Sequence, residues 1–109
     1  MLIIDSDGGL YKDQAEALKT FVEANTKIPT GSAYDFMAPF AMMTYGKVAE
    51  EQGIWSAGAA LKIFGGTAAG AIPIEQNKEG KLIINTRIAK TMGVEIPFDL
   101  LRSADQVIE

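Results

Sequence analysis

The sequence predicts an α/β fold in which a parallel, Rossmann-like sheet is built from strand–helix–strand units. Two parts of the chain carry this prediction. The apolar run at residues 2–4 stops at Asp5 and is followed by a helical pattern over residues 11–24. A second apolar run, residues 40–45, precedes a longer helical pattern over residues 47–64. Strands that alternate with helices in this way favour right-handed βαβ connections and a parallel sheet.

The elements of the first part follow from apolar periodicity. Residues 2–4 are predicted to form a buried strand, because unbroken apolar runs are typical of strands in parallel sheets. The helix over residues 11–24 places its apolar side chains on one face, at Tyr11, Ala15, Leu18 and Val22. Residues 28–30 are predicted to form a second short strand. Residues 33–39 carry no prediction, since Pro39 limits any helix there.

The longest predicted helix follows the third strand, residues 40–45. It covers residues 47–64, and Gly65 is a suitable C-terminal stop. Gly53 and Gly58 each weaken this helix by about 1 kcal/mol relative to Ala. We therefore expect the two glycines to allow close packing against another backbone.

The last part of the chain begins with a flexible connector at residues 65–71, which lacks the Lys-Ser/Thr ending of a phosphate-binding loop. Residues 72–75 and 82–84 are predicted to be short strands. A helix over residues 85–93 is expected to be capped by its Asn and ended by its Gly, and another short helix begins after Pro97.

Composition excludes several classes of function. The chain has 109 residues, a formal net charge of −4, no cysteine and no histidine. These numbers predict one globular domain without a basic surface for nucleic acid. They also exclude disulfides, thiol nucleophiles and relays that need histidine. No apolar run approaches the length of a membrane span, and no export signal is expected in this chain.

The stretch "LIIDSDGG", residues 2–9, allows three interpretations. Asp5 and Asp7 have the spacing of the nucleophile and acid/base pair in haloacid-dehalogenase-like phosphatases. Such an enzyme also needs an acidic pair for magnesium, and the only adjacent acids, Glu50 and Glu51, lie in a predicted helix. Alternatively, Asp5 or Asp7 caps the helix that follows. In the third interpretation, Ser6 and Asp7 contact a ligand at the carboxyl end of a parallel strand.

The sequence "IPIEQNKEGKLIINTRIAKTMGVEIPFDLLRSADQVIE", residues 72–109, resembles the C-terminal end of one family of ABC-transporter substrate-binding proteins, the group that includes tryptophan-binding lipoproteins. In that family a strand L-[VI]-I-N leads into a helix T-A-K-x-[LM]-G, followed by I-P, a Leu pair and A-D-x-V-I. The matching residues run without a gap: Leu82 to Asn85, Ile88 to Gly93, Ile96 and Pro97, Leu100 and Leu101, and Ala104 to Ile108. Upstream, "TYGKVAEEQG" is similar to the family's Thr-Tyr-Gly segment and the helix after it.

The resemblance implies a position for the ligand. In the family, the turn after the first strand faces the ligand cleft, and by resemblance this turn is Ser6, Asp7 and Gly8. The loop after the next strand lies at the same edge of the cleft, and here it carries Ser32 and Tyr34. Tyr34 and Tyr45 lie at strand ends, where a tyrosine either contacts a ligand or packs in the core. The candidate ligand-binding residues are therefore Ser6, Asp7, Gly8, Ser32, Tyr34 and Tyr45. The resemblance implies no catalytic residue, no metal and no cofactor.

The family fold has two lobes, that of the type I periplasmic binding proteins. By resemblance, this chain is the C-terminal part of such a protein, with the chain crossing between lobes near residues 44–46. Residues 1–43 are then expected in one lobe, and the remainder is expected to pack on the other. Apolar side chains that would pack against the missing part of the fold are then exposed. We expect them to cause self-association of the isolated chain into a homo-oligomer.

The implied function is capture of a small extracytoplasmic solute by hinge closure and delivery to a membrane permease, without chemistry. An amino acid is one such solute. The identity of the ligand does not carry over from relatives, because Ala49 and Glu50 replace a frequent aromatic pair and Gly8 replaces a frequent Asn. The alternative, from another class, is a ligand-sensing or interaction domain within a signalling protein.

Overall fold

The computed structural model describes residues 1–6, 9 and 12–109, and the chain divides into two compact units. Met1–Gly46 and Lys81–Glu109 form the first unit, and Lys47–Gly80 forms the second. Strand pairing joins the last residues of the chain to its first part. Which lobe of a two-lobed protein each unit represents stays a prediction.

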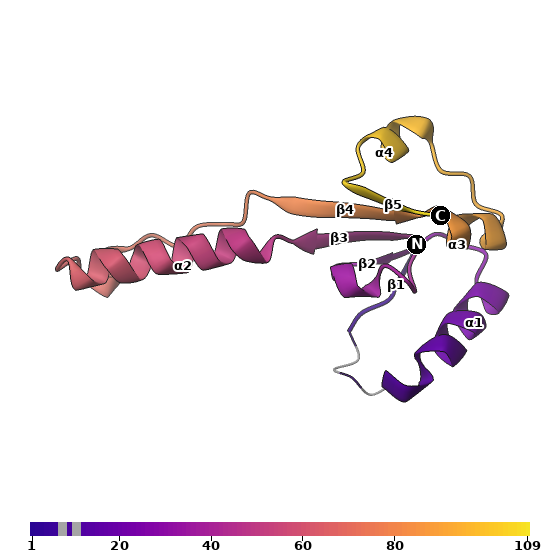
Figure 1. The fold of residues 1–109 in the computed structure, drawn as a ribbon, viewed down its shortest axis with the longest axis horizontal. Helices are drawn as coiled ribbons and strands as arrows, with labels where there is room; N and C mark the ends of the chain where they lie inside the picture. The colour runs from indigo at the N-terminus through magenta and orange to yellow at the C-terminus, as the bar shows by residue number, and fades with distance from the viewer. Residues whose placement is uncertain (7–8, 10–11) are drawn as a thin grey trace. The chain divides into compact units, whose positions relative to one another are not determined.

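The first unit is built on a five-stranded sheet with the order β1-β2-β3-β4-β5 (Figure 1). The strands are β1 (Leu2–Ile3), β2 (Thr30–Ser32), β3 (Met43–Lys47), β4 (Gly80–Asn85) and β5 (Gln106–Ile108). The pairs β1–β2, β2–β3 and β4–β5 are parallel. The predicted α/β class with a mainly parallel sheet is confirmed.

Strand β4 runs against β3. The backbone N–H of Asn85, at the end of β4, donates to the carbonyl of Met42, just before β3, at 2.8 Å. The arrows of the two strands point in opposite directions in Figure 1. The start of β4 therefore lies at the edge of the sheet where β3 ends.

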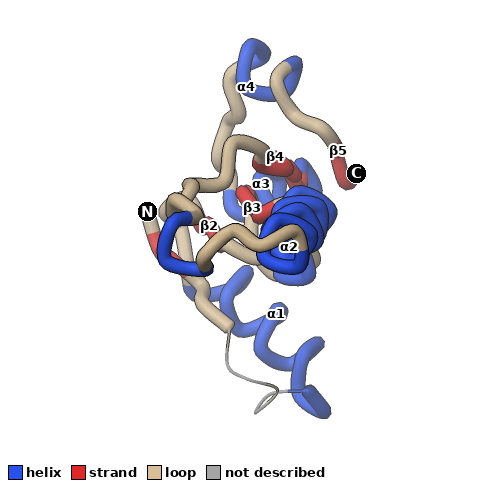
Figure 2. The backbone as a smooth tube through the Cα atoms, turned by 90° about the vertical axis from the view of Figure 1, so that its left-hand side faces the viewer, coloured by secondary structure: helices blue, strands red, loops and turns tan. Residues whose placement is uncertain are grey.

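Three helices belong to the first unit: α1 (Ala15–Asn25), α3 (Thr86–Met92) and α4 (Phe98–Arg102). Figure 2 shows α1 and α4 on opposite sides of the strands. Helices α1 and α3 contact each other, and the Arg87 guanidinium pairs with the Glu23 carboxylate at 3.0 Å. The main apolar cluster packs α3 against the chain before β3 and consists of Met42, Ile88, Ala89 and Met92, with Val94 and Ile96 at its margin.

The second unit contains α2 (Ala49–Phe64) and a single turn of 3-10 helix, η3 (Ala69–Ala71). Two further such turns, η1 (Lys12–Gln14) and η2 (Asp35–Met37), belong to the first unit. Helix α2 buries none of its residues. Ideal Cβ atoms built on Gly53 and Gly58 have no neighbour within 4 Å, so the expected close backbone packing at these glycines is wrong for the residues that the structure describes.

Helix ends were predicted well because their signals are local. Asn85 caps α3, where its side chain accepts a hydrogen bond from the N–H of Ile88 at 3.1 Å. Gly93 ends the same helix with φ of 68°, the left-handed conformation that glycine adopts most easily. Helix α2 ends at Gly65, and α4 begins after Pro97.

Strand positions were predicted less well. Strand β2 begins two residues later than expected and β3 three residues later. The delay of β3 has a clear cause, because the chain before it forms helical turns in which the N–H groups of Phe40 and Ala41 both donate to the carbonyl of Met37. Gly46 lies within β3. A Cβ on Gly46 would approach the backbone N of Asp35 to 3.2 Å, so this glycine allows close contact with η2.

Three further expectations at the sheet need correction. Residues 72–75 form no strand, and Ile74 is 99% exposed. Residues 106–108 form β5, which was not predicted. Leu2 and Ile3 form the predicted strand but are exposed, because β1 is an edge strand of the sheet in the structure.

Polar side chains occupy the centre of the first unit. Thr30 is fully buried, and its Oγ1 accepts a hydrogen bond from the N–H of Met42 at 2.9 Å. Asn85, 1% exposed, also donates from Nδ2 to the carbonyl of Ala38 at 3.0 Å. Among the described residues, the buried Oγ1 of Thr44 has no hydrogen-bond partner. The Thr30 side chain therefore connects β2 to the segment between β2 and β3, and the Asn85 side chain connects β4 to that segment and to α3.

Replacing Asn85 by alanine is expected to lower the free energy of unfolding by about 2 to 4 kcal/mol. The substitution removes the cap of α3 and leaves the N–H of Ile88 and the carbonyl of Ala38 without partners in a buried site. Urea unfolding followed by circular dichroism measures the loss. The matched control is Asn25→Ala, at the exposed end of α1, and a similar loss in both variants would contradict the assignment.

Replacing Thr44 by valine is expected to leave stability unchanged or to raise it by about 1 kcal/mol, because a methyl group replaces a buried hydroxyl that has no partner in the described structure. The same unfolding measurement applies. Thr30→Val is the control that should destabilise, since it removes the hydrogen bond to Met42. A Thr44→Val variant as unstable as Thr30→Val would refute the expectation.

Candidate functional site

The three parallel strands β1, β2 and β3 end at one edge of the sheet. Ile3 lies opposite Gly31, and Ser32 lies opposite Thr44. The N–H of Ile4 continues the pairing by donating to the carbonyl of Gly31 at 2.8 Å. Residues that directly follow β1 and β2 therefore lie near the last residues of β3. The carboxyl ends of parallel strands are where open α/β sheets bind ligands.

The chain after β1 turns on Asp5. Its Oδ1 accepts a hydrogen bond from the N–H of Ser6 at 2.8 Å, and both side chains are exposed. The expectation that Asp5 caps the following helix is wrong: Gln14 occupies that position of α1, without a capping side-chain bond, because η1 intervenes. The other two predicted residues of this turn, Asp7 and Gly8, lie outside the described residues.

The loop after β2 is shaped by Ser32, which is 8% exposed. Its Oγ accepts a hydrogen bond from the N–H of Tyr34 at 3.3 Å. Tyr34 is exposed, and its ring lies 5.2 Å from the ring of Phe36, centroid to centroid. Ser32 thus orders the loop, while Tyr34 and Phe36 form an accessible aromatic pair.

Tyr45 lies on the other face of the sheet. Successive side chains of a strand point to opposite faces, and residues paired across parallel strands share a face. Since Thr44 pairs with Ser32, Tyr45 faces away from both. It is 61% exposed. The structure therefore gathers Ser6, Ser32 and Tyr34 near one edge and presents Tyr45 on a separate surface.

A groove of about 340 Å³ lies beside the loop after β2, in the first unit. It is lined by Asp35, Phe36, Ala38, Pro39, Lys81, Ile83, Gln106 and Ile108. Asp35 and Lys81 bring opposite charges to it, and neither forms an ion pair among the described residues. Sequence reasoning missed both. Lys81 reaches this edge only because β4 runs against β3, a pairing that no local sequence signal reveals.

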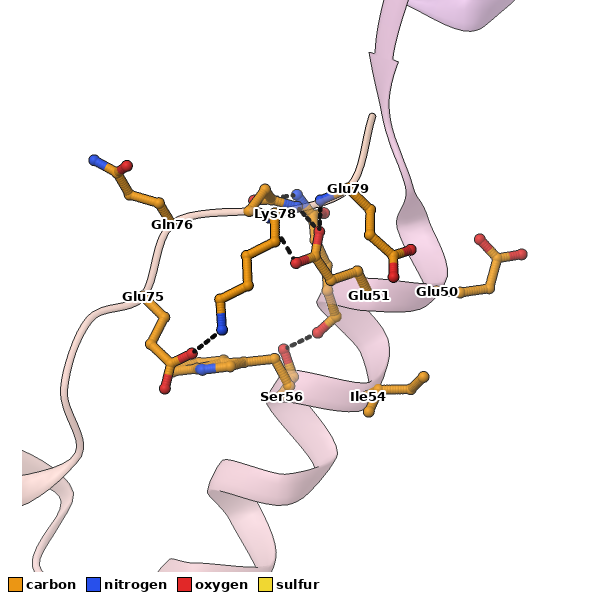
Figure 3. Close-up of a pocket in the computed structure, with 11 residues that line it drawn as sticks. Glu50, Glu51, Ile54, Ser56, Glu75, Gln76, Lys78 and Glu79 are labelled. Atoms are coloured by element: carbon orange, nitrogen blue, oxygen red, sulfur yellow. Dashed lines mark hydrogen bonds and ion pairs between the residues drawn. The ribbon is translucent and has the colours of Figure 1, made fainter. Parts of the chain in front are cut away.

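The second unit contains a larger hollow of about 590 Å³ between the start of α2 and residues 75–79 (Figure 3). The Glu51 carboxylate lines it and accepts several hydrogen bonds. Oε1 accepts from the N–H of Lys78 at 2.7 Å, and Oε2 accepts from the N–H of Glu79 and from Asn77 Nδ2, each at 3.1 Å. These contacts, with the Lys78 N–H as the largest cause, hold the pKa of Glu51 below its ordinary value.

The phosphatase interpretation gains no support from this geometry. Asp5 belongs to the first unit and uses a carboxylate oxygen in its own turn. The Glu50–Glu51 pair belongs to the second unit, where Glu51 uses both oxygens on neighbouring N–H groups. Across residues 1–6, 9 and 12–109, no three acidic, histidine or cysteine side chains are grouped so that they could hold a metal ion.

Comparison with solved structures supports the fold. A conserved domain protein from Vibrio cholerae O1 biovar eltor superposes with a TM-score of 0.70 at 22% identity over 96% of this chain and 35% of that chain. A substrate-binding protein with adhesive properties from Clostridium difficile, in its ligand-free, open form, gives 0.70 at 24% identity over 98% and 35%.

An ABC domain from Streptococcus pneumoniae in complex with L-Trp gives a TM-score of 0.63 at 25% identity over 86% of this chain and 34% of that chain. The chain thus spans about a third of the length of these proteins. No curated protein matches it.

The sequence pattern of the family described as ABC transporter substrate binding protein matches residues 10–108, which is nearly the whole chain. Together with the mainly parallel α/β sheet, this match assigns the chain: it belongs to the ABC transporter substrate-binding protein family.

Proposed function

We propose that the chain supplies one wall of the solute pocket in a substrate-binding protein of an ABC transporter. The observation that carries the proposal is the family match over residues 10–108 combined with polar side chains at the edge where β1, β2 and β3 end. Ser6, Ser32 and Tyr34 are the proposed contacts there, and Asp7 and Gly8, which lie outside the described residues, are proposed from the family resemblance alone. Tyr45 is proposed as a contact on the opposite face.

The proposed solute carries an amino group and a carboxylate, as an amino acid does. The groove beside η2 offers the Asp35 carboxylate for an ammonium group and the Lys81 ammonium for a carboxylate. Phe36 adds an apolar surface beside them. The L-Trp complex of the related pneumococcal domain is consistent with this class of ligand. Binding of this kind requires no catalytic step.

The proposed mechanism is hinge closure, in which a solute that contacts two lobes favours the closed state. We assign the first unit to one lobe and Lys47–Gly80 to the other. The chain leaves the first unit after Gly46, close to the crossover that the sequence placed at residues 44–46. Differential affinity for the closed state is what drives the change.

A receptor of this kind works outside the cytoplasm and delivers solute to a membrane permease, which we propose as the partner. In the part of the chain that the structure describes, no helix combines the length and the hydrophobicity that crossing a bilayer requires.

Titration of the ¹⁵N-labelled chain with L-tryptophan and a panel of other L-amino acids tests the pocket. We expect the amide signals of Phe36 and Lys81 to shift with a Kd in the millimolar range, about −4 kcal/mol, because one wall provides only part of the contacts. Asp35→Asn should weaken the binding and so require more amino acid for the same shift, because only the Lys81 contact remains, whereas Asp99→Asn, on exposed α4, should bind like the wild type.

Two results of that titration would contradict the proposal. Micromolar binding to the 109-residue chain would show that the pocket does not need a second wall. No shift with any amino acid at tens of millimolar would exclude this class of solute, since even a single favourable ion pair in a groove should be detected there.

Self-association is expected because α2 leaves large apolar side chains uncovered. Ile54, Leu61 and Phe64 are 76%, 71% and 87% exposed. Light scattering across a concentration series should show dimers or larger species, and Leu61→Gln with Phe64→Gln should restore the monomer. Phe98→Gln, an exposed position of the first unit, serves as the control. A wild-type monomer at high concentration would count against this expectation.

A further inference from the structure

We propose that Glu51 is a positioning residue that links the two segments joining the units, and that it thereby limits how freely the units move during solute capture. The movement between the units is part of the function proposed above, and this inference depends on it. The role of Glu51 is argued from the geometry of the second unit alone.

The position of Glu51 along the chain is the first argument. The chain passes between the units twice, from Gly46 to Lys47 and from Gly80 to Lys81. Glu51 lies in the first turn of α2, shortly after the first passage. The groups that it contacts, the N–H groups of Lys78 and Glu79, lie just before the second passage. One side chain therefore connects the beginning of α2 to the segment that enters β4.

The chemistry of the contact is the second argument. Residues 73–79 form no helix or strand, so their backbone N–H groups have no partners from regular structure. The Glu51 carboxylate accepts from two of them and from the Asn77 side chain, and Gln52 Nε2 also donates to Asn77 Oδ1 at 3.4 Å. Hydrogen bonds to a charged acceptor are shorter and stronger than those between neutral groups.

The hydrogen bonds of Glu51 distinguish it from Glu50, the adjacent acid on α2. The charged residues that line the hollow with it are Glu50 on α2, whose side chain points away from Glu51 in Figure 3, and Glu75, Lys78 and Glu79 on the segment opposite. Lys78 Nζ pairs with Glu75 at 3.5 Å, which keeps both side chains on the same side of the hollow (Figure 3). Glu50 is exposed and forms no hydrogen bond or ion pair among the described residues, so it is a matched control.

The contact is expected to depend on pH. The N–H of Lys78 and the other donors favour the charged form, so the pKa of Glu51 is lowered. The stabilisation is therefore complete above the ordinary pKa of glutamate and is lost as the pH falls through the lowered pKa of the folded protein. Protonation removes the negative charge and turns one of the two carboxylate oxygens into an O–H donor, so the side chain can no longer accept from these N–H groups with both oxygens.

The experiment measures amide–water exchange and ¹⁵N relaxation in the 109-residue chain without ligand. In Glu51→Ala, the amides of Lys78 and Glu79 should exchange at least tenfold faster, and α2 should tumble more independently of the sheet. Glu51→Gln keeps a neutral acceptor and should give a smaller effect. Glu50→Gln should behave like the wild type. Amide shifts of Lys78 and Glu79 should titrate with Glu51 and lose that titration in Glu51→Gln.

Three outcomes would overturn the proposal: unchanged exchange at Lys78 and Glu79 in Glu51→Ala, faster exchange without any change in the tumbling of α2, or equal effects of Glu50→Gln and Glu51→Gln. If Glu51→Ala fails to fold, the titration and the Glu51→Gln variant still decide. Because no solute is used, failure of amino-acid binding would refute the proposed function and leave the role of Glu51 standing.

Discussion

The first unit depends on the buried side chain of Asn85. Its Oδ1 caps α3 through the N–H of Ile88, and its Nδ2 binds the carbonyl of Ala38 in the segment between β2 and β3. Its backbone N–H pairs β4 with the chain before β3. One residue therefore connects a helix, two strands and the segment that carries the candidate site. A buried amide of this kind tolerates few replacements, because each lost partner leaves another polar group unpaired.

The return of β4 against β3 gives the site its charges. In a purely parallel sheet, the start of a strand lies at the edge opposite the carboxyl ends of the strands, where the candidate site is found. The antiparallel pairing reverses this for β4, so Lys81 comes to the groove that Asp35 and Phe36 line. Ser32 orders the loop that carries these residues by binding the N–H of Tyr34. The edge thus combines one acid, one base and an aromatic pair, which are groups suited to a zwitterionic solute.

The second unit is held together by hydrogen bonds to a carboxylate rather than by a buried apolar cluster. Helix α2 has no buried residue, and the segment opposite it lacks regular structure. Hydrogen bonds from residues 77–79 to one carboxylate therefore provide the contact that the apolar side chains do not. Under the proposed hinge closure, such a contact would be open to regulation by charge, whereas apolar packing would not.

The sequence by itself determined the α/β class, the C-terminal end of α2, both ends of α3, the start of α4, and the family, because helix periodicity, caps and motif spacing are local properties. It placed Ser6, Ser32 and Tyr34 near strand ends for the same reason. Tertiary structure decided the remainder. The helical turns before β3 delayed the start of that strand, and β5 was missed because short strands are stabilised by their neighbours. Asp35, Lys81 and the Glu51 contacts were not predicted, since their partners are distant in the sequence and only pairing of strands and segments brings them together.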